Sequence, residues 1–323
     1  MSADAPLFQI DGLTIDSIRA DRRRRIVQDV SLCVAPGQIY GLVGESGSGK
    51  SVSMMASVGL ATTGLAVQAG TVRFGGVVQQ AVDQRGLKQN LSHGISLLFQ
   101  NAKGALSPFL ATGAQVGRVL DRQAIPRADR EARISELFRV VGLNHADLGG
   151  KYPHQISGGQ AQRVAMACAL ATDPKLLIAD EPTTALDVTT EREMLRFLKR
   201  LCEDRGLAII LVAHNLSLVS EYCSGLSILH AGQVVEDGDL GAIFDEPLHP
   251  YTQGLIAAVP DVDEPHELIP IAGSVWGGSA DIDRCRFSHR CPFAMPRCDA
   301  GIPTGIRTRG RNVHCVLYDE AAS

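Results

Sequence analysis

The sequence predicts an α/β fold with a mainly parallel sheet. Three short apolar runs, at residues 39–43, 176–179 and 207–213, are typical of buried strands, and stretches of helical periodicity separate them. Strands of a parallel sheet are buried on both faces, so they carry continuous apolar runs instead of alternating ones. A glycine-rich turn follows the first run and opens a helix, which is the setting of a phosphate-binding loop.

The size and composition are those of an ordinary globular protein. The length of 323 residues suggests about two domains, and 45% of the residues are hydrophobic while 20% are charged. The formal net charge of −4 argues against a protein that binds nucleic acid through an overall basic surface. We expect no membrane span, because the longest apolar run is 207–213, and no secretion signal at the N-terminus.

Periodicity gives the order of the other elements. Alternation of apolar and polar residues predicts strands near 8–15 and 26–34, with the run Arg22 to Arg25 at the tip between them. Further elements are expected at these positions: helices at 50–60, over much of 102–155 and at 189–205, and a strand pair at 226–230 and 234–236. From about residue 246 the composition shifts toward Pro, His, Cys and Arg, so we place a domain boundary between 1–245 and 246–323.

Eight residues after the strand at 39–43 match the pattern GxxxxGK[ST]. They are Gly44, Glu45, Ser46, Gly47, Ser48, Gly49, Lys50 and Ser51. Glycines let backbone N–H groups turn toward phosphate oxygens, and the helix N-terminus adds partial positive charge. We therefore expect Lys50 at the β- and γ-phosphates and the Ser51 hydroxyl at Mg²⁺.

A carboxylate pair, Asp180 and Glu181, follows the apolar strand at 176–179. An Asp-Glu pair after a strand is usually a solvated turn. Its place downstream of a P-loop in the same α/β domain favours a phosphoryl-transfer site instead. Asp180 is then expected to hold Mg²⁺ through its water shell, and Glu181 to polarise the attacking water.

The segment Ile156-Ser157-Gly158-Gly159-Gln160 opens another helix. Ser157 and Gln160 have the spacing of a capping box, and the two glycines let backbone N–H groups approach an anion at the helix start. With the two motifs above, this segment resembles the LSGGQ signature of ATP-binding cassette (ABC) transporters, with Ile156 in place of leucine. The resemblance implies that the segment closes over the nucleotide of a partner cassette, so that ATP is sandwiched at a dimer interface.

Three further motifs resemble the same family. Phe99-Gln100 is similar to its Q-loop, Thr184-Ala185-Leu186-Asp187 to its D-loop, and His214 to its switch histidine. The resemblance implies that Gln100 contacts Mg²⁺ or the attacking water and senses the membrane subunit, and that His214 contacts the γ-phosphate. It covers residues 7 to about 240. It implies a RecA-like P-loop domain with an N-terminal antiparallel β subdomain and a helical subdomain at about 102–172.

One feature of the family is missing. The resembling proteins place an aromatic residue near the end of the first strand, where it stacks on adenine, but this chain has Ser17 there. No aromatic residue occurs between Phe8 and Tyr40. We expect weaker discrimination between ATP and GTP, unless an arginine from Arg22 to Arg25 stacks on the base instead.

The segment His249-Pro250-Tyr251-Thr252, followed by a helix-like stretch to Pro260, resembles the C-terminal region of one ABC subgroup. That subgroup imports oligopeptides, dipeptides, and nickel or metal chelates. The resemblance therefore implies an importer subunit, although a proline turn of no special function would read the same way.

Four cysteines crowd this C-terminal region, in the spacing C-x5-C-x6-C-x16-C: Cys285, Cys291, Cys298 and Cys315. The spacing matches neither a common ferredoxin run nor the short hooks of structural zinc sites. Because some relatives in the resembling family carry a four-iron cluster here, the resemblance implies a [4Fe-4S] cluster held by these four. Zinc, with His289 and His314 as further ligands, or free thiols are the alternatives.

Charge also bears on this region. From Arg284 to Cys315 the chain has seven arginines and one acid, Asp299. Such charge would stabilise an anionic cluster, and it would equally attract anionic lipid head groups.

Together these motifs predict an ATPase coupled to import of peptides or peptide-like solutes. The resemblance implies ATP and Mg²⁺, a second ATPase subunit that is a paralogue, two membrane permeases and an extracytoplasmic solute-binding protein. It places the chain at the cytoplasmic face of the inner membrane and implies no nucleic acid partner. The rival functions are the cassette of an exporter and a non-transport ABC ATPase that acts on nucleic acid.

Overall fold

The fold was analysed in a computed structural model, which describes residues 5–19, 22–123, 125–183, 187–259, 271–275 and 283–319. The chain divides into two compact units. The first contains Met1–Ala35, Ile39–Gln89 and Leu211–Ser323, and the second contains Pro36–Gln38 and Asn90–Ile210. Within the described ranges, no helix is long and apolar enough to cross a membrane.

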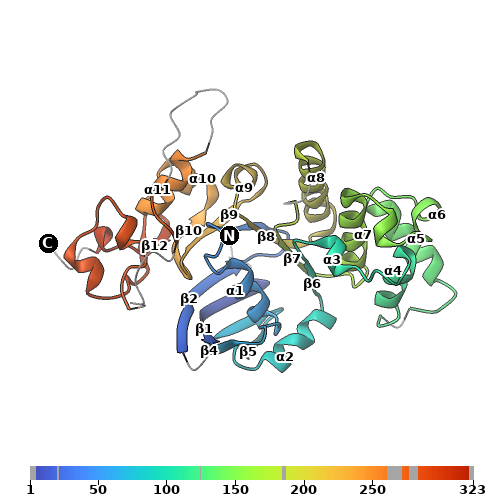
Figure 1. The fold of residues 1–323 in the computed structure, drawn as a ribbon, viewed down its shortest axis with the longest axis horizontal. Coiled ribbons are helices and arrows are strands. Elements are labelled where there is room, and N and C mark those ends of the chain that lie inside the picture. Colours follow the sequence, from blue (N-terminus) through green and yellow to red (C-terminus); the bar gives the residue numbers. More distant parts are fainter. Residues whose placement is uncertain are drawn as a thin grey trace. The chain divides into compact units, whose positions relative to one another are not determined.

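The first unit contains a four-stranded antiparallel sheet, drawn in blue in Figure 1. Its order is β2-β1-β4-β5, formed by β1 (Phe8–Arg19), β2 (Arg22–Val34), β4 (Leu65–Phe74) and β5 (Val77–Gln80). The predicted hairpin is confirmed, because β1 and β2 pair from Phe8 with Val34 to Arg19 with Arg22. The run Arg22 to Arg25 was predicted to form the tip of this hairpin, but it forms the first part of β2.

The first unit also carries part of a second sheet, in the order β11-β12-β10-β9-β3. These strands are β3 (Ile39–Val43), β9 (Gly225–His230), β10 (Gln233–Asp239), β11 (Ile306–Thr308) and β12 (Arg311–Val313). Strand β3 pairs in parallel with β9, whereas β9, β10, β12 and β11 pair antiparallel. The predicted α/β class is therefore right, but the sheet is mixed instead of mainly parallel.

The described part of the first unit carries these α-helices: α1 (Lys50–Ser57), α2 (Gln84–Lys88), α9 (Leu216–Tyr222), α10 (Leu240–Asp245) and α11 (Pro250–Ala257). Helix α1 packs against β1, α9 against β3, and α10 and α11 against β10. The buried aromatic and aliphatic side chains of β1, including Phe8, Ile10 and Leu13, supply the core of this unit.

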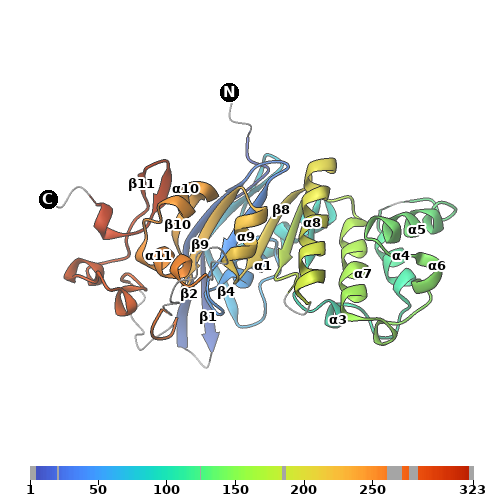
Figure 2. The same cartoon turned by 90° about the horizontal axis from the view of Figure 1, so that it is seen from above.

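The second unit is built around the parallel pair β6 (Ile95–Leu98) and β7 (Leu176–Asp180). Its helices are α3 (Ala102–Ala105), α4 (Thr112–Leu120), α5 (Arg130–Val140), α6 (His145–Leu148), α7 (Gly158–Leu170) and α8 (Val188–Arg205). Figure 2 shows α4 and α5 gathered beside α7, and α6 next to them. Strand β8 (Ala208–Ala213) runs through the division between the units.

Capping residues fix where the longest described helix, α8, begins and ends. Asp187 accepts hydrogen bonds from the backbone N–H groups of Thr189 and Thr190, so α8 begins after it. Gly206, at a φ of 65°, ends the same helix in the left-handed conformation that glycine tolerates. Because both caps can be read from the sequence, the helix predicted at 189–205 is confirmed nearly to the residue.

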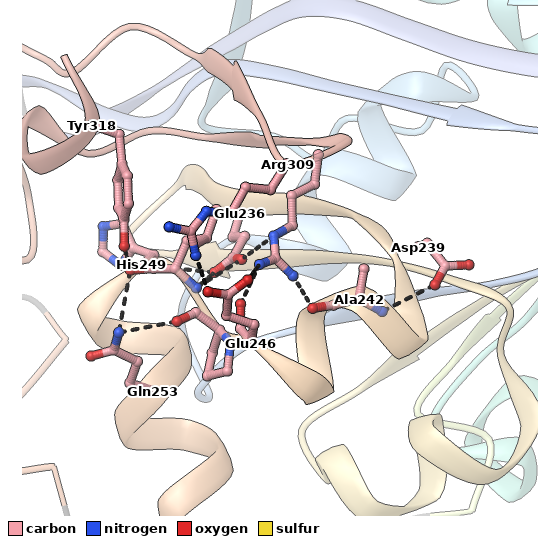
Figure 3. Close-up of polar contacts among 11 residues, drawn as sticks. Glu236, Asp239, Ala242, Glu246, His249, Gln253, Arg309 and Tyr318 are labelled. Atoms are coloured by element: carbon pink, nitrogen blue, oxygen red, sulfur yellow. Dashed lines mark hydrogen bonds and ion pairs between the residues drawn. The ribbon is translucent and has the colours of Figure 1, made fainter. Parts of the chain in front are cut away.

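A buried ion pair attaches the hairpin β11–β12 to β10. Arg311 Nε lies 3.4 Å from Glu236 Oε1, and their side chains are 2% and 0% exposed. Glu236 also accepts hydrogen bonds from the backbone N–H groups of Leu248 and His249, at 3.1 and 2.9 Å. Figure 3 shows Glu236 at the centre of these contacts. A buried carboxylate needs such partners to offset the loss of water. Glu236 therefore holds both β12, through Arg311, and the segment at Leu248 and His249.

Candidate nucleotide site

The loop after β3 has the backbone geometry of an anion site. A Cβ atom on Gly44 would lie 2.0 Å from the carbonyl oxygen of Leu229, so only glycine fits there. Gly47 and Gly49 have φ angles of 79° and 102°, in the left-handed region that glycine enters without strain. The turn leads directly into the N-terminus of α1, where the sequence predicts that its N–H groups bind phosphate.

Lys50 supports this loop from within. Its side chain is buried, and Nζ donates hydrogen bonds to the carbonyl oxygens of Gly44 and Glu45, at 2.7 and 3.0 Å. The N–H of Gly232, in the turn between β9 and β10, donates to the carbonyl oxygen of Ser48 at 2.7 Å. Both sides of the loop are thus held, and Ser46 and Ser51 lie in the same segment, with Ser51 in the first turn of α1.

The second unit brings together two of the predicted catalytic residues. Gln100, just after β6, donates from Nε2 to Oε2 of Glu181 at 2.8 Å. Glu181 follows Asp180, which ends β7 and is buried. Glu181 has a φ of 45°, which is uncommon for a residue other than glycine and stores backbone strain at this turn.

The signature segment caps α7 in the predicted way. Ser157 Oγ accepts from the N–H of Gln160 at 3.2 Å, and Gln160 Oε1 accepts from the N–H of Ser157 at 3.0 Å. This capping box holds the start of the helix while Gly158 and Gly159 leave its backbone uncovered by side chains. A Cβ on Gly159 would come within 3.3 Å of the Thr190 methyl group, so a larger residue would press on α8.

The remaining predicted positions lie at the ends of strands or helices. His214 follows β8 directly and precedes Asn215, which caps α9. Asp187 caps α8, and its hydrogen bonds from Thr190 and Thr189 lower its pKa. Residues 184–186 of the predicted D-loop lie outside the described residues.

The position expected to stack on adenine is part of β1. Ser17 pairs with Arg24 of β2 on one side and with Leu65 of β4 on the other. The next arginine, Arg25, is held by Asp16 Oδ1 at 2.6 Å from its Nε, and by Gln28 Oε1 at 2.7 Å from Nη1. The side chain of Arg25 is thus ordered and about one-quarter exposed, whereas Arg23 and Arg24 are exposed.

Sequence reasoning missed two residues that contact the P-loop. The hydroxyl oxygen of Tyr251 accepts a hydrogen bond from the N–H of Glu45 at 3.1 Å. Arg290 forms an ion pair with the Glu45 carboxylate, at 2.6 Å from Nη1 to Oε2. Tyr251 lies in the segment 249–252, which resembles the peptide-importer subgroup, but no local sequence pattern connects Tyr251 or Arg290 with Glu45.

The four C-terminal cysteines lie near one another. The N–H of Cys285 donates to the carbonyl oxygen of Cys298 at 3.0 Å. Burial, together with the neighbouring thiols of Cys298, Cys315 and Cys291, raises the pKa of Cys285 to about 12. However, within the described ranges no three His, Cys, Asp or Glu side chains converge as metal ligands.

Comparison with known proteins places these observations in a family. Residues 27–184 match the family model described as "ABC transporter", and residues 235–298 match "Oligopeptide/dipeptide transporter, C-terminal region". The dipeptide transport ATP-binding protein DppD of Escherichia coli is 37% identical over 313 residues, covering 96% of each chain. The chain belongs to the ABC transporter family. The resemblance found in its motifs is thereby confirmed.

Other relatives agree with this assignment. A Brucella abortus protein, provisionally named a peptide import ATP-binding protein, is 40% identical over 314 residues, 96% of this chain and 95% of its own. A solved ATP-binding cassette, a dimer in a post-hydrolysis state with ADP and Pi, matches with a TM-score of 0.64 and 27% identity. It covers 72% of this chain and 98% of its own length. The ABC ATPase fold and the enzyme class therefore follow.

The missing aromatic leads to a testable expectation. We expect the dissociation constants of MgATP and MgGTP to differ by less than about tenfold, because a lost aromatic stack removes about 0.5–1.5 kcal/mol of contact energy with the base. Equilibrium binding to the purified chain measures both constants. Arg25→Ala tests whether Arg25 stacks on the base in place of an aromatic residue, because the variant would then bind both nucleotides more weakly. A strong preference of the wild-type chain for ATP would contradict the expectation.

Proposed function

We propose that the chain is the ATP-hydrolysing subunit of an importer for peptides or peptide-like solutes, a class that includes metal chelates. The observation that carries the proposal is that one chain combines a preformed P-loop with the peptide-transporter C-terminal region, and that this region contacts the loop at Glu45. The names of the relatives, which refer to peptide import and dipeptide transport, support the substrate class.

The proposed roles follow from the chemistry of each side chain. Lys50 and the N–H groups of the P-loop would bind the phosphates of ATP. Ser51, Gln100 and Asp180 would hold Mg²⁺, which neutralises charge on the phosphates when it is bound.

A second group of residues would activate and orient the attacking water. Glu181 would accept a proton from this water, and the hydrogen bond from Gln100 fixes the orientation of its carboxylate. His214 would contact the γ-phosphate. No covalent intermediate is needed, because water attacks in line.

A second cassette would complete the site. Ser157, Gly158, Gly159 and Gln160 would close over the nucleotide held by the partner, with Asp187 near the same interface. We infer that the partner is a paralogue, so that the assembly is a heterodimer. The dimeric state of the solved relative supports pairing as such.

The same assembly would include two permeases and an extracytoplasmic solute-binding protein, at the cytoplasmic face of the inner membrane. Phe99, beside Gln100, is 43% exposed, and Phe109 is 85% exposed. We assign contact with the permeases to these two exposed side chains, which a partner would cover. The chain would then be peripheral to the membrane.

The rival functions fit less well. An exporter cassette or a nucleic-acid ATPase would share the P-loop and signature, but neither accounts for the match of residues 235–298 to a peptide-transporter region. The net charge of −4 gives no support to a nucleic acid partner either.

We propose residues 1–245 as the nucleotide-binding domain and residues 246–323 as the C-terminal extension.

We also propose that Cys285, Cys291, Cys298 and Cys315 hold a [4Fe-4S] cluster with a structural role. The proximity of the four thiols supports a shared ligand, and the raised pKa values of Cys285, Cys291 and Cys315 argue against reactive free thiolates. Among the described residues the four side chains do not converge as ligands, so cluster binding would need them to turn toward one another and lose their protons. Zinc, with His289 or His314 as a ligand, is the alternative.

The catalytic assignment is tested by Glu181→Gln. This variant removes the proton acceptor but keeps the side-chain volume, so we expect MgATP binding to persist while hydrolysis falls on the order of a hundredfold. ATP turnover of the complete transporter complex is the measurement. Glu203→Gln, on the exposed face of α8, is the matched control and should hydrolyse ATP at the wild-type rate. Undiminished turnover in Glu181→Gln would exclude the role given to Glu181.

The metal assignment is tested by anaerobic purification. We expect a brown protein with broad visible absorption and equal amounts of iron and acid-labile sulfide, as a four-iron cluster requires. Cys298→Ser should lose the colour and the iron, whereas Cys168→Ser in α7 should keep both. A colourless protein with stoichiometric zinc, or with no metal, would overturn the cluster and leave the ATPase proposal intact.

A further inference from the structure

The second residue of the P-loop, Glu45, places a carboxylate in a loop that binds anions. Its side chain is 31% exposed. Because Glu45 belongs to the loop proposed to bind phosphates, its negative charge would repel them unless another group compensates it. A cation that pairs with this carboxylate would remove that repulsion.

Arg290, from the C-terminal region, is that group. It donates from Nη1 to Glu45 Oε2 at 2.6 Å and from Nη2 to Oε1 at 3.0 Å, the bidentate geometry that makes strong, directional pairs. The Arg290 side chain is 1% exposed. Its guanidinium also donates to the backbone carbonyl oxygens of Ala272, at 2.7 Å from Nε, and Ile271, at 3.1 Å from Nη2. The planar group is thus fixed in one orientation before any nucleotide binds.

The charge state of this cluster is settled by the same contacts. The hydrogen bonds from Arg290 lower the pKa of Glu45, so the carboxylate is ionised at neutral pH. His230 Nδ1 lies 3.8 Å from Glu45 Oε2, but burial and the charge of Arg290 lower the pKa of His230 to about 3. His230 is therefore neutral, and it does not take over the role of Arg290 as the cation beside Glu45.

Tyr251 holds the backbone of the same residue. Its hydroxyl accepts from the N–H of Glu45, and its fully buried ring packs between His230 and Phe287, at centroid distances of 4.4 and 5.3 Å. The segment that carries Tyr251 is itself anchored, because His249 Nδ1 accepts from the N–H of Tyr251 at 3.0 Å. Backbone and side chain of Glu45 are thus both held from the C-terminal region.

We propose that Arg290 is a positioning residue for ATP binding, acting through Glu45, and that Tyr251 assists it. Arg290 neutralises the charge of Glu45 and holds its carboxylate in one orientation, so that the N–H groups of the P-loop and Lys50 meet the phosphates without this repulsion. By this inference the C-terminal region contributes directly to the nucleotide site, in addition to its association with peptide transporters. The inference rests on the proposed function and names a further residue of the same site.

The test is a cycle of variants at the two positions. The dissociation constant of MgATP, measured with a fluorescent ATP analogue on the purified full-length chain, should rise about tenfold or more in Arg290→Gln, the size typical for loss of a charged hydrogen-bonded partner. The double variant Glu45→Gln/Arg290→Gln should recover most of this loss, because no carboxylate is left to repel the phosphates. A merely structural role of Arg290 would give no such recovery.

Further variants separate charge from geometry. Arg290→Lys keeps the charge without the bidentate fork and should lie between the wild type and Arg290→Gln. Tyr251→Phe should weaken binding by a few-fold, since it removes only the acceptor of the Glu45 N–H. Arg309→Gln is the matched control, because Arg309 pairs with Glu246 at the exposed end of the same region and should bind MgATP like the wild type.

Each outcome decides the inference. A folded Arg290→Gln variant with wild-type affinity would overturn it, and so would a double variant that binds as weakly as Arg290→Gln alone. If Arg290→Gln does not fold, Arg290→Lys and the double variant decide in the same way. A wild-type chain that fails to bind MgATP would refute the proposed function itself, which is a distinguishable result.

Discussion

The P-loop can take its shape only because its backbone packs against a neighbouring strand end with no side chain between them. Gly44 lies so close to the carbonyl oxygen of Leu229, at the end of β9, that any Cβ would collide with it. The next turn along the chain is equally tight, because a Cβ on Gly232 would lie 1.9 Å from the carbonyl oxygen of Ile26. These approaches fix β3, β9 and β2 around the loop, and the other contacts of the first unit build on this arrangement.

The C-terminal region extends this arrangement to a side chain. Its hairpin is anchored at β10 by Arg311 and Glu236, and Tyr318 donates to the carbonyl oxygen of Leu248 at 2.9 Å (Figure 3). From this anchored base α11 carries Tyr251 to the P-loop. Buried ion pairs contribute little net stability on average, since desolvation offsets much of the Coulomb energy. Their value here is that they specify one geometry, which a loop that binds phosphates requires.

The sequence predicts the parts of this fold whose signal is local. The apolar strands β7 and β8 are buried throughout, and the helix start at Asp187 depends on a cap within three residues. Strand β5 was not predicted, because its residues are mostly exposed and it shows no apolar run. The strands β11 and β12 have three residues each, too few for any period to appear.

The same limit applies to the candidate site. The motif residues of the P-loop, the carboxylate pair and the signature could be recognised because each motif is contiguous. The pairing of Arg290 with Glu45 spans 245 positions, and nothing in either local pattern indicates the other. Likewise the contact between Gln100 and Glu181 depends on the parallel pairing of β6 with β7, which the alternation of residues cannot report.

The central claim is that ATP hydrolysis by this chain drives peptide import. The most direct measurement uses proteoliposomes that contain the chain, its partner cassette and both permeases, with the solute-binding protein and labelled peptide outside and MgATP inside. The account predicts ATP-dependent accumulation of peptide, together with ATP turnover that rises when the loaded binding protein is added. ATP turnover without peptide uptake, or net movement of solute outward, would contradict it.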